Sequence, residues 1–208
     1  MRTEILPASS NDTILRALSV LSAGGLVAFP TDTVYGVGAL AFDGKAIESI
    51  YAAKDRPVEK AIPVLISDAG ELDKVGINIP EVALNLASRF WPGPLTILVP
   101  KRADLPRAVS ATSTVGVRVP DHVTARALLR AAGPMAVTSA NISGGQSPVN
   151  AEQVYEQLGA RIPLIIDGGR TPGGIPSTLV DCTTSELTIL REGPLALEEL
   201  ISALDRAP

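Results

Sequence analysis

Three cationic side chains lie within seven positions of one another, where a predicted helix ends. Lys54, Arg56 and Lys60 belong to the stretch "YAAKDRPVEKAIPV", residues 51–64. Pro57 disfavours helical backbone at the residue before it, so Arg56 is expected to be extended, with its guanidinium held in a fixed direction. A solvated loop can carry the same charges, and this alternative stays open for the three residues taken alone. Guanidinium and ammonium groups fixed in this way could bind phosphate oxygens.

More polar side chains stand at the ends of predicted strands. They carry hydroxyl, amide and guanidinium groups, and they are Thr31, Thr33, Thr114, Arg118, Ser139 and Asn141. Each has a simple local explanation, such as a hydrogen bond to the backbone of a turn. If these strand ends meet at one edge of a sheet, they line a pocket that has many donors and few acids. The sequence therefore predicts a phosphate pocket beside groups that could hold ribose or an amino acid.

The common catalytic signatures are absent from the sequence. It contains no G-x-x-x-x-G-K-[ST], no G-x-G-x-x-G after a strand, no H-E-x-x-H and no G-x-S-x-G. His122, the only histidine, follows the predicted helix cap Asp121, so we expect a solvent-facing residue of the first turn rather than a catalytic one. Cys182, the only cysteine, is expected to be a half-buried structural thiol. We expect any metal to arrive with a substrate, because these ligands are too few for a structural zinc site.

The length and composition indicate one α/β domain over residues 1–208. Hydrophobic residues make up 46% of the 208 residues, yet no apolar run approaches the roughly 18 residues of a membrane span. The formal net charge of −4 argues against a protein that mainly coats nucleic acid. The start, "MRTEILPASSND", lacks the apolar core of a secretory signal. We therefore expect a cytoplasmic protein with no membrane contact.

Helical and strand patterns alternate along the chain. In the first predicted helix, capped by Asn11 or Asp12, one face carries Ile14, Leu15, Leu18 and Leu21. Helices are predicted over residues 11–23, 43–54 and 80–90, after Asp121, after Asn150 and from about 196. Strands are predicted in "LVAFP", "TVYGVGALA", "IPVLI", "LTILVP", "VGVRVP", "MAVTSA", "PLIID", "STLVD" and "LTILRE". This order favours a mixed, twisted sheet with flanking helices, and the Gly-rich stretch 167–177 is expected to line a site.

Six short motifs occur in a recognisable order between about residue 10 and residue 195. They are "FPTDTVYGVG", "KDRP", "VRVPDH", "SAN", "STLVD" and "LREG". In this order and spacing the sequence resembles the YrdC/Sua5 family, the L-threonylcarbamoyladenylate synthases of tRNA modification. The chain ends about fifteen residues after "LREG", which is similar to the short, single-domain form of the family.

The resemblance implies both a fold and a reaction. The implied fold is a twisted mixed α/β sheet with flanking helices around a deep cationic cavity, similar to dihydroxybutanone-phosphate synthase. The implied enzyme is a nucleotidyltransferase that converts L-threonine, bicarbonate and ATP, with Mg²⁺, to threonylcarbamoyl-AMP and pyrophosphate. This product would feed N6-threonylcarbamoyladenosine (t6A) modification of tRNAs that read ANN codons, through downstream t6A-transferase proteins. Direct contact with tRNA stays open.

The resemblance also implies roles for particular residues. The catalytic tetrad around the nucleotide would be Lys54, Arg56, Ser139 and Asn141. Threonine contacts would be Thr33, Arg118 and Ser177. Further ATP contacts would be Lys60, Thr114, Ser147 and Arg191. Asp32 stands where the family often has Glu. Which residue of 62–67 contacts threonine stays undetermined.

Two alternatives remain at this stage. The first is an RNA-binding module, for tRNA or double-stranded RNA, that uses a cationic cavity without catalysis; the acidic net charge weighs against it. The second is the chemistry of the hydrogenase-maturation carbamoyltransferases, which contain a similar domain. Those chains also carry zinc-finger and acylphosphatase-like regions, which this sequence has neither the length nor the cysteines to form.

Overall fold

The computed structural model describes residues 2–10, 12–184 and 186–205, and the strands of these residues form one sheet of ten strands. The strand order is β1-β8-β2-β3-β7-β4-β6-β5-β9-β10, with parallel and antiparallel pairs mixed. The strands are β1 (Glu4–Pro7), β2 (Val27–Phe29), β3 (Gly36–Leu40), β4 (Val64–Leu65), β5 (Leu95–Pro100), β6 (Thr114–Arg118), β7 (Met135–Ser139), β8 (Leu164–Asp167), β9 (Thr178–Asp181) and β10 (Thr188–Arg191). The predicted mixed sheet is confirmed.

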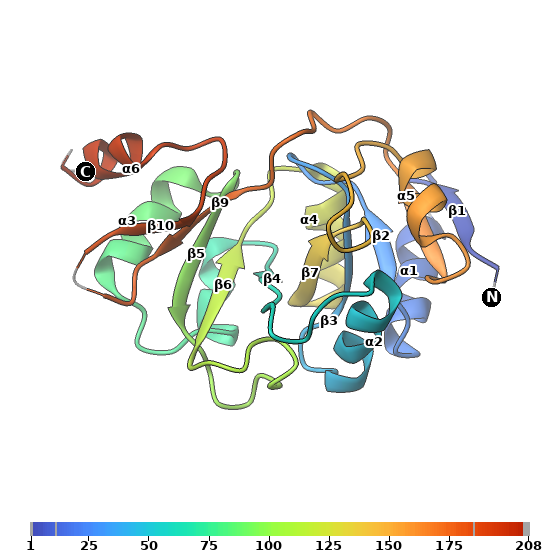
Figure 1. Cartoon of the computed structure of the whole chain (residues 1–208), viewed down its shortest axis with the longest axis horizontal. Helices are drawn as coiled ribbons and strands as arrows, with labels where there is room; N and C mark the ends of the chain where they lie inside the picture. Colours follow the sequence, from blue (N-terminus) through green and yellow to red (C-terminus); the bar gives the residue numbers. More distant parts are fainter. Residues whose placement is uncertain (1, 11, 185, 206–208) are drawn as a thin grey trace.

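Helices flank this sheet along its length, as Figure 1 shows. They are α1 (Asp12–Ser22), α2 (Gly44–Lys54), α3 (Glu81–Phe90), α4 (Val123–Ala132), α5 (Ala151–Leu158), α6 (Leu197–Asp205) and the 3₁₀ helix η1 (Ala69–Lys74). The predicted alternation is confirmed, but β1 and η1 were not predicted. Neither shows a clear apolar pattern, because β1 has no buried residue and η1 has only Leu72. None of the described helices is long and apolar enough to cross a lipid bilayer.

Two apolar clusters pack against opposite faces of the sheet. Val27 and Phe29 belong to the cluster with α1 and α4, whereas Ala28 between them belongs to the cluster with α2, α3 and α5. Successive strand residues point to opposite faces, so this alternation places the two sets of helices on the two sides. The core is therefore layered as helix, sheet and helix.

The buried face of helix α1 is rotated from the predicted one, although Leu21 is buried as predicted and Ile14 packs against the same cluster. Its buried residues are Thr13, Ala17, Val20 and Leu21, whereas Leu15 is 65% exposed. Spacings of three and four from Thr13 define this stripe, and the small Ala17 lies where α1 packs against α4. Leucine spacing alone did not reveal this face. The proposed cap Asn11 lies outside the described residues.

Helix α2 ends at Lys54, as the sequence predicted. Its N-cap Asp43 accepts a hydrogen bond from the backbone N of Ala46 at 3.0 Å. At the other end Asp55 adopts left-handed backbone with φ of 51°, and the N–H of Arg56 donates to the carbonyl of Tyr51 at 3.0 Å. This turn directs Arg56 away from the helix axis and into the connection to β4.

The start of α4 differs from its prediction. The N-cap is His122, which makes no side-chain capping hydrogen bond, so the proposal that Asp121 caps this helix is wrong. The helix begins one residue later than expected, because His122 keeps extended backbone with φ of −142°. Asp121 instead lines a pocket beside Asp32.

Matched truncations in α1 test which of its faces is buried. We expect Leu21→Ala to lower the free energy of unfolding by about 2 to 5 kcal/mol, because Leu21 is 1% exposed. Leu15→Ala should change it by no more than about 0.5 kcal/mol, since Leu15 is 65% exposed. Urea denaturation of both variants checks this, and equal losses would contradict the packing described for α1.

Candidate functional site

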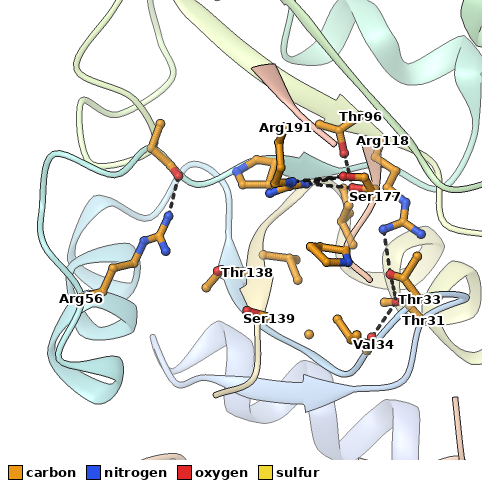
Figure 2. A pocket seen from close by; sticks show the side chains of 16 residues that line it. Thr31, Thr33, Val34, Arg56, Thr96, Arg118, Thr138, Ser139, Ser177 and Arg191 are labelled. Carbon is orange, nitrogen blue, oxygen red and sulfur yellow. Dashed lines mark hydrogen bonds between the residues drawn. The ribbon is translucent and has the colours of Figure 1, made fainter. Parts of the chain in front are cut away.

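Three arginines from distant parts of the chain line one pocket of about 180 Å³. Arg56 follows α2, Arg118 ends β6 and Arg191 ends β10. In the view of Figure 2, Arg56 lies on one side of the pocket, Arg118 on the other and Arg191 between them. No acidic residue is among the described residues that line the pocket. Hydroxyl groups complete its polar lining and come from Thr31, Thr33, Thr96, Thr138, Ser139 and Ser177.

The structure brings six of the eleven predicted site residues into this lining. They are Thr33, Arg56, Arg118, Ser139, Ser177 and Arg191. The other five, which do not line it, are Lys54, Lys60, Thr114, Asn141 and Ser147. The roles assigned to all eleven remain predictions.

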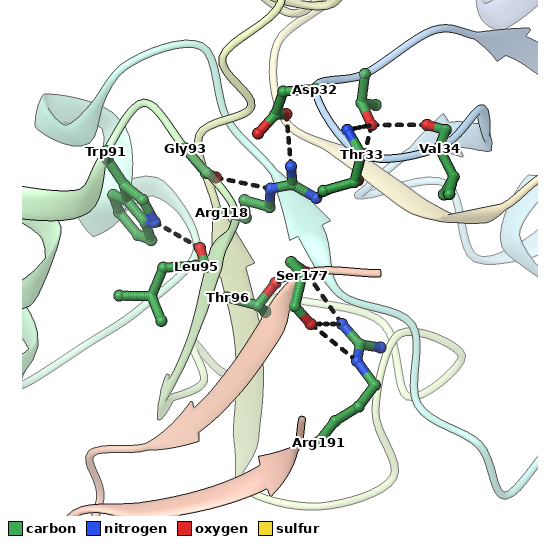
Figure 3. A network of polar contacts seen from close by, with 11 residues as sticks. Asp32, Thr33, Val34, Trp91, Gly93, Leu95, Thr96, Arg118, Ser177 and Arg191 are labelled. Atoms are coloured by element: carbon green, nitrogen blue, oxygen red, sulfur yellow. Dashed lines mark hydrogen bonds and ion pairs between the residues drawn. The ribbon is translucent and has the colours of Figure 1, made fainter. Parts of the chain in front are cut away.

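Arg118 is the most enclosed of the three arginines, with 5% of its surface exposed. Figure 3 shows its guanidinium between Gly93, Thr33 and Asp32. Nε donates to the carbonyl of Gly93 at 2.9 Å, Nη1 to Oγ1 of Thr33 at 3.1 Å and Nη2 to Oδ1 of Asp32 at 2.5 Å. Burial lowers the pKa of Arg118, and the negative charge of Asp32 opposes this shift. The ion pair thus balances this positive charge and fixes its direction.

The other two arginines of the pocket have no carboxylate partner in the described part of the chain. Arg56 donates to the carbonyls of Lys60 at 3.2 Å and Ala61 at 2.9 Å. Arg191 donates from Nε and Nη2 to the carbonyl of Ser177 at 3.0 and 2.9 Å, and from Nη2 to its hydroxyl at 3.0 Å. Carbonyl and hydroxyl oxygens orient these guanidinium groups without neutralising them. The pocket therefore holds two positive charges that an anionic ligand could balance.

The pKa values of these arginines reflect their shared surroundings. Partial removal from water lowers the pKa of Arg191, and the charges of Arg118 and Arg56 lower it further. Partial burial also lowers the pKa of Arg56. Guanidinium groups stay charged through such shifts, so the repulsion between them persists at neutral pH. A polyanion in the pocket would relieve it.

Lys54 is buried behind the pocket, with 1% of its surface exposed. Its Nζ donates to the backbone carbonyls of Ser139 and Asn141, and its own carbonyl accepts from the N–H of Ser143 at 2.8 Å. Burial lowers the pKa of Lys54 to about 7, and the charge of Arg56 adds to this shift. The side chain therefore holds the loop after β7 in place and does not face the pocket.

Asn141 stabilises the same loop from within. Its Nδ2 donates to the carbonyls of Ile142 and Gly145, both at 2.8 Å, while its Oδ1 is buried without a partner among the described residues. This loop begins at Ser139, whose side chain lines the pocket. Lys54 and Asn141 thus determine where Ser139 is presented.

Besides Asn141, three more predicted ATP contacts lie outside the pocket lining. Lys60 is exposed on the loop after α2, and its carbonyl accepts from Arg56 and Tyr51. Thr114 begins β6, whereas Arg118 ends it, and the Thr114 hydroxyl contacts that of Thr112 at 3.1 Å. Ser147 is half-buried in the segment before α5.

The Gly-rich stretch 167–177 lines the pocket, as predicted, through Pro176 and Ser177. The hydroxyl of Tyr35 anchors this stretch by donating to the carbonyl of Gly169 at 2.7 Å and accepting from the N–H of Gly168 at 3.2 Å. Burial raises the pKa of Tyr35 to about 12. The N–H of Gly173 also donates to the carbonyl of Thr33 at 2.8 Å, which connects the stretch to the threonine loop.

Sequence reasoning did not identify Thr96 as a pocket residue. It also left open which residue of 62–67 contacts threonine. Thr96 is 1% exposed, and its hydroxyl lies 2.7 Å from that of Ser177. A polar residue inside the apolar strand "LTILVP" was the available signal for it. From residues 62–67, Pro63 and Leu65 reach the pocket, so its wall is apolar there.

His122 and Cys182 do not line the pocket. His122 is half-buried rather than solvent-facing, because its Nδ1 is covered and has no partner within the described residues. Burial lowers its pKa. Cys182 is 1% exposed rather than half-buried, and burial raises its pKa to about 12, which disfavours a thiolate nucleophile.

A family model described as "Telomere recombination", of the Sua5, YciO and YrdC proteins, matches residues 19–193. The chain belongs to the Sua5/YciO/YrdC family. This confirms the resemblance that the six motifs indicated.

Members of this family are similar to the chain both in sequence and in structure. The threonylcarbamoyl-AMP synthases of Pyrococcus abyssi and Bacillus subtilis are 44% and 42% identical to this chain over 88% and 92% of its length. The chain spans 55% and 57% of the length of these two relatives. The structure of P. abyssi Sua5 complexed with L-threonine superposes with a TM-score of 0.94 at 41% identity, covering 98% of this chain and 61% of that one.

The buried Lys54 gives this family member a testable pH dependence. A lysine whose folded pKa is about 7, below the ordinary 10.5, binds fewer protons in the folded than in the unfolded chain. Stability should therefore rise with pH above 7. Cys182 and Tyr35 lower the stability as pH rises, because their pKa values are raised in the folded chain. This effect begins only above about pH 8.5 for the cysteine and about pH 10 for the tyrosine, where these groups ionise in the unfolded chain.

We expect the unfolding free energy of the parent chain to gain about 1 to 2 kcal/mol relative to Lys54→Met between about pH 7 and 8.5. The methionine keeps the apolar stem but cannot titrate. Urea denaturation of both proteins at several pH values measures the difference. Parallel stability curves would show that Lys54 keeps its proton throughout this range.

Proposed function

We propose that this chain is an L-threonylcarbamoyladenylate synthase, which forms threonylcarbamoyl-AMP and pyrophosphate from L-threonine, bicarbonate and ATP. The observation that carries the proposal is the pocket that gathers Arg56, Arg118 and Arg191, two of them without a carboxylate partner among the described residues. Such a site suits a triphosphate. The P. abyssi and B. subtilis relatives bear the name threonylcarbamoyl-AMP synthase, which supports the same activity.

The proposed reaction needs no protein nucleophile. The amine of threonine and bicarbonate give a carbamate and water. A carbamate oxygen then attacks the α-phosphorus of ATP, and pyrophosphate leaves as the bond to the β-phosphate oxygen breaks. The protein holds the carbamate in line with phosphorus and stabilises charge on the phosphates. The buried Cys182, with a pKa raised to about 12, has no part in these steps.

The pocket residues divide these tasks by charge. Arg56 and Arg191 are proposed to bind the phosphates, because their charges are not neutralised by an acid. Arg118, already paired with Asp32, is proposed to direct its remaining N–H groups at the threonine carboxylate, beside Thr33. Ser139 and Ser177 add hydroxyl groups at the pocket wall. Water release from the pocket would strengthen these contacts.

Magnesium is proposed to enter with ATP. No group of three or more His, Cys, Asp and Glu side chains suited to a metal occurs among the described residues. The phosphate oxygens of ATP would supply most ligands, and the bound cation would neutralise charge on the leaving pyrophosphate. Lys60, Thr114, Asn141 and Ser147 stay predicted contacts of the nucleotide, outside the pocket lining.

The product is expected to pass to t6A-transferase proteins in the cytoplasm. A mixed carbamic–phosphoric anhydride is reactive toward water, so direct transfer to a partner would protect it. Contact with tRNA is part of this proposal only through that partner. The net charge of −4 gives no support to an extensive RNA surface.

Product formation tests the proposed reaction directly. The full chain is incubated with ATP, Mg²⁺, L-threonine and labelled bicarbonate, and the products are separated and identified by mass. We expect a labelled threonylcarbamoyl adenylate together with pyrophosphate, and neither when threonine is omitted. Salt-sensitive RNA binding in a parallel filter assay, with no ATP consumed, would instead favour the non-catalytic RNA module.

Removing Arg56 tests the proposed phosphate contact. Arg56→Ala should fold normally, because the side chain is half-buried on a loop, yet lower threonine-dependent pyrophosphate release by about 100-fold or more. Arg130→Ala, at an exposed arginine in the last turn of α4, is the matched control and should keep parental activity. Parental turnover by a folded Arg56→Ala protein would exclude Arg56 from the reaction.

A further inference from the structure

Thr96 places a buried hydroxyl group inside the otherwise apolar strand β5. Its side chain is 1% exposed, and among the described residues the hydroxyl has one hydrogen-bond partner, Oγ of Ser177 at 2.7 Å. Burying a hydroxyl costs free energy unless it is hydrogen-bonded, whereas a valine of the same shape would carry no such cost. Any effect of this hydroxyl on the pocket therefore passes through Ser177 or through a bound ligand.

The two branches of the Thr96 side chain point to different neighbouring strands. Strand β5 lies between β6 and β9. Cγ2 of Thr96 lies 3.1 Å from the position that a Cβ would take at Gly116 of β6, whereas Oγ1 contacts Ser177, the residue before β9. A β-branched side chain has few alternative rotamers, so the methyl group packed over Gly116 holds the hydroxyl toward Ser177.

Strand register brings Thr96, Ser177 and Arg191 to one face of the sheet, as Figure 3 shows. Leu179 of β9 is the partner of both Thr96 of β5 and Arg191 of β10. Partnered residues point to the same face, and Ser177 precedes Leu179 by two positions, so it shares this face. The three polar side chains thus form a row from an inner strand to the edge strand β10.

Arg191 depends on Ser177 for its direction. It ends an edge strand whose register shifts between Ile189 and Arg191. All hydrogen bonds of its guanidinium within the described residues go to Ser177, from Nε and Nη2 to the carbonyl and from Nη2 to the hydroxyl. A movement of Ser177 would therefore move or release the guanidinium.

The hydroxyl groups of Thr96 and Ser177 leave one donor available to a ligand. A guanidinium can only donate, so Oγ of Ser177 accepts from Arg191 at 3.0 Å. One of the two hydroxyl protons lies in the contact between Thr96 and Ser177, and the other has no acceptor among the described residues. Both side chains line the pocket. The row therefore presents donors, which suit an anionic oxygen.

We propose that Thr96 is a positioning residue of the phosphate site: its hydroxyl fixes Ser177, and Ser177 fixes Arg191 toward a phosphate group of the ligand. The inference rests on the proposed function, which supplies the identity of that ligand. In this assignment Thr96 makes no contact with phosphate. Without its hydroxyl, Arg191 keeps its charge but is less well oriented, so phosphate is bound more weakly.

Two substitutions at Thr96 separate the hydroxyl from the methyl group. Thr96→Val keeps the shape and removes the hydroxyl, whereas Thr96→Ser keeps the hydroxyl and removes the methyl group. We expect Thr96→Val to raise the dissociation constant of inorganic pyrophosphate by about 10-fold, and Thr96→Ser to change it by less than about twofold. Calorimetric titration of the full chain in the presence of Mg²⁺ measures both. Unchanged affinity in Thr96→Val, or a larger loss in Thr96→Ser, would overturn the proposal.

A double-mutant cycle tests whether Thr96 acts through Ser177. Ser177→Ala should weaken pyrophosphate binding at least as much as Thr96→Val does, and it keeps the test valid if Thr96→Val does not fold. Adding Thr96→Val to Ser177→Ala should then change the dissociation constant by less than about twofold. A further 10-fold loss in the double variant would show that Thr96 acts independently of Ser177, against the proposal.

The control is Thr13→Val, which removes another buried threonine hydroxyl. Thr13 is also 1% exposed, its hydroxyl donates to the carbonyl of Pro7 at 2.8 Å, and it does not line the pocket. This variant should be less stable than the parent chain but should bind pyrophosphate with parental affinity. An equal loss of affinity in Thr13→Val would show a general effect of destabilisation and would overturn the role of Thr96.

Binding and turnover together separate this inference from the proposed function. Weaker pyrophosphate binding by Thr96→Val, with no adenylate formed by the parent chain, would overturn the synthase proposal alone. Formation of the adenylate with a parental KM for ATP in Thr96→Val would overturn the role of Thr96 alone. A loss of threonine affinity without a loss of pyrophosphate affinity would also overturn it, because Ser177 would then serve the amino acid. Failure of the parent chain to bind pyrophosphate or ATP would overturn both.

Discussion

Unbalanced positive charge in a small pocket is the constraint on which the site depends. Arg56, Arg118 and Arg191 line about 180 Å³, and charges of the same sign repel strongly where water is partly excluded. The chain neutralises Arg118 with Asp32 and directs the other two with uncharged oxygens. Their repulsion is compatible with folding because two apolar clusters hold the two faces of the sheet. A bound triphosphate would supply the missing negative charge.

Backbone carbonyls, rather than acidic side chains, hold most of the cations around this site. Lys54 donates to two carbonyls of the loop after β7, and Arg56 donates to two carbonyls of its own loop. A carboxylate at these positions would form stronger pairs, but it would also repel phosphate. Carbonyl acceptors fix direction and leave the charge available to a ligand. The carbonyl groups thus set the orientation of these cationic side chains without changing the net charge of the site.

The pocket has both charged and apolar surface, because neighbouring strands of the sheet place different types of side chain next to each other. Arg118 and Leu65 are partners on β6 and β4, so a buried guanidinium lies beside an aliphatic side chain. An amino acid has the same combination of charge and apolar surface within a few bonds. Ser177 and Thr96, joined through their hydroxyl groups at 2.7 Å, bring the Gly-rich stretch to the other side of this pair. The substrate class proposed above follows from this adjacency.

The sequence by itself determined what depends on neighbours along the chain. The order of most helices and strands and the end of α2 at Lys54 followed from periodicity and capping. The six motifs also determined the family. These features are readable because capping and periodicity act over a few residues.

Only the tertiary structure decided which of these groups meet. Lys54 and Arg56 are two positions apart, yet one is buried against the loop after β7 and the other lines the pocket. Leu65 lies beside Arg118 only because β4 and β6 are paired, although Arg118 is 53 positions later in the chain. Such pairings depend on strand order and register, which are set by packing of the whole sheet. Local sequence patterns carry no record of that packing.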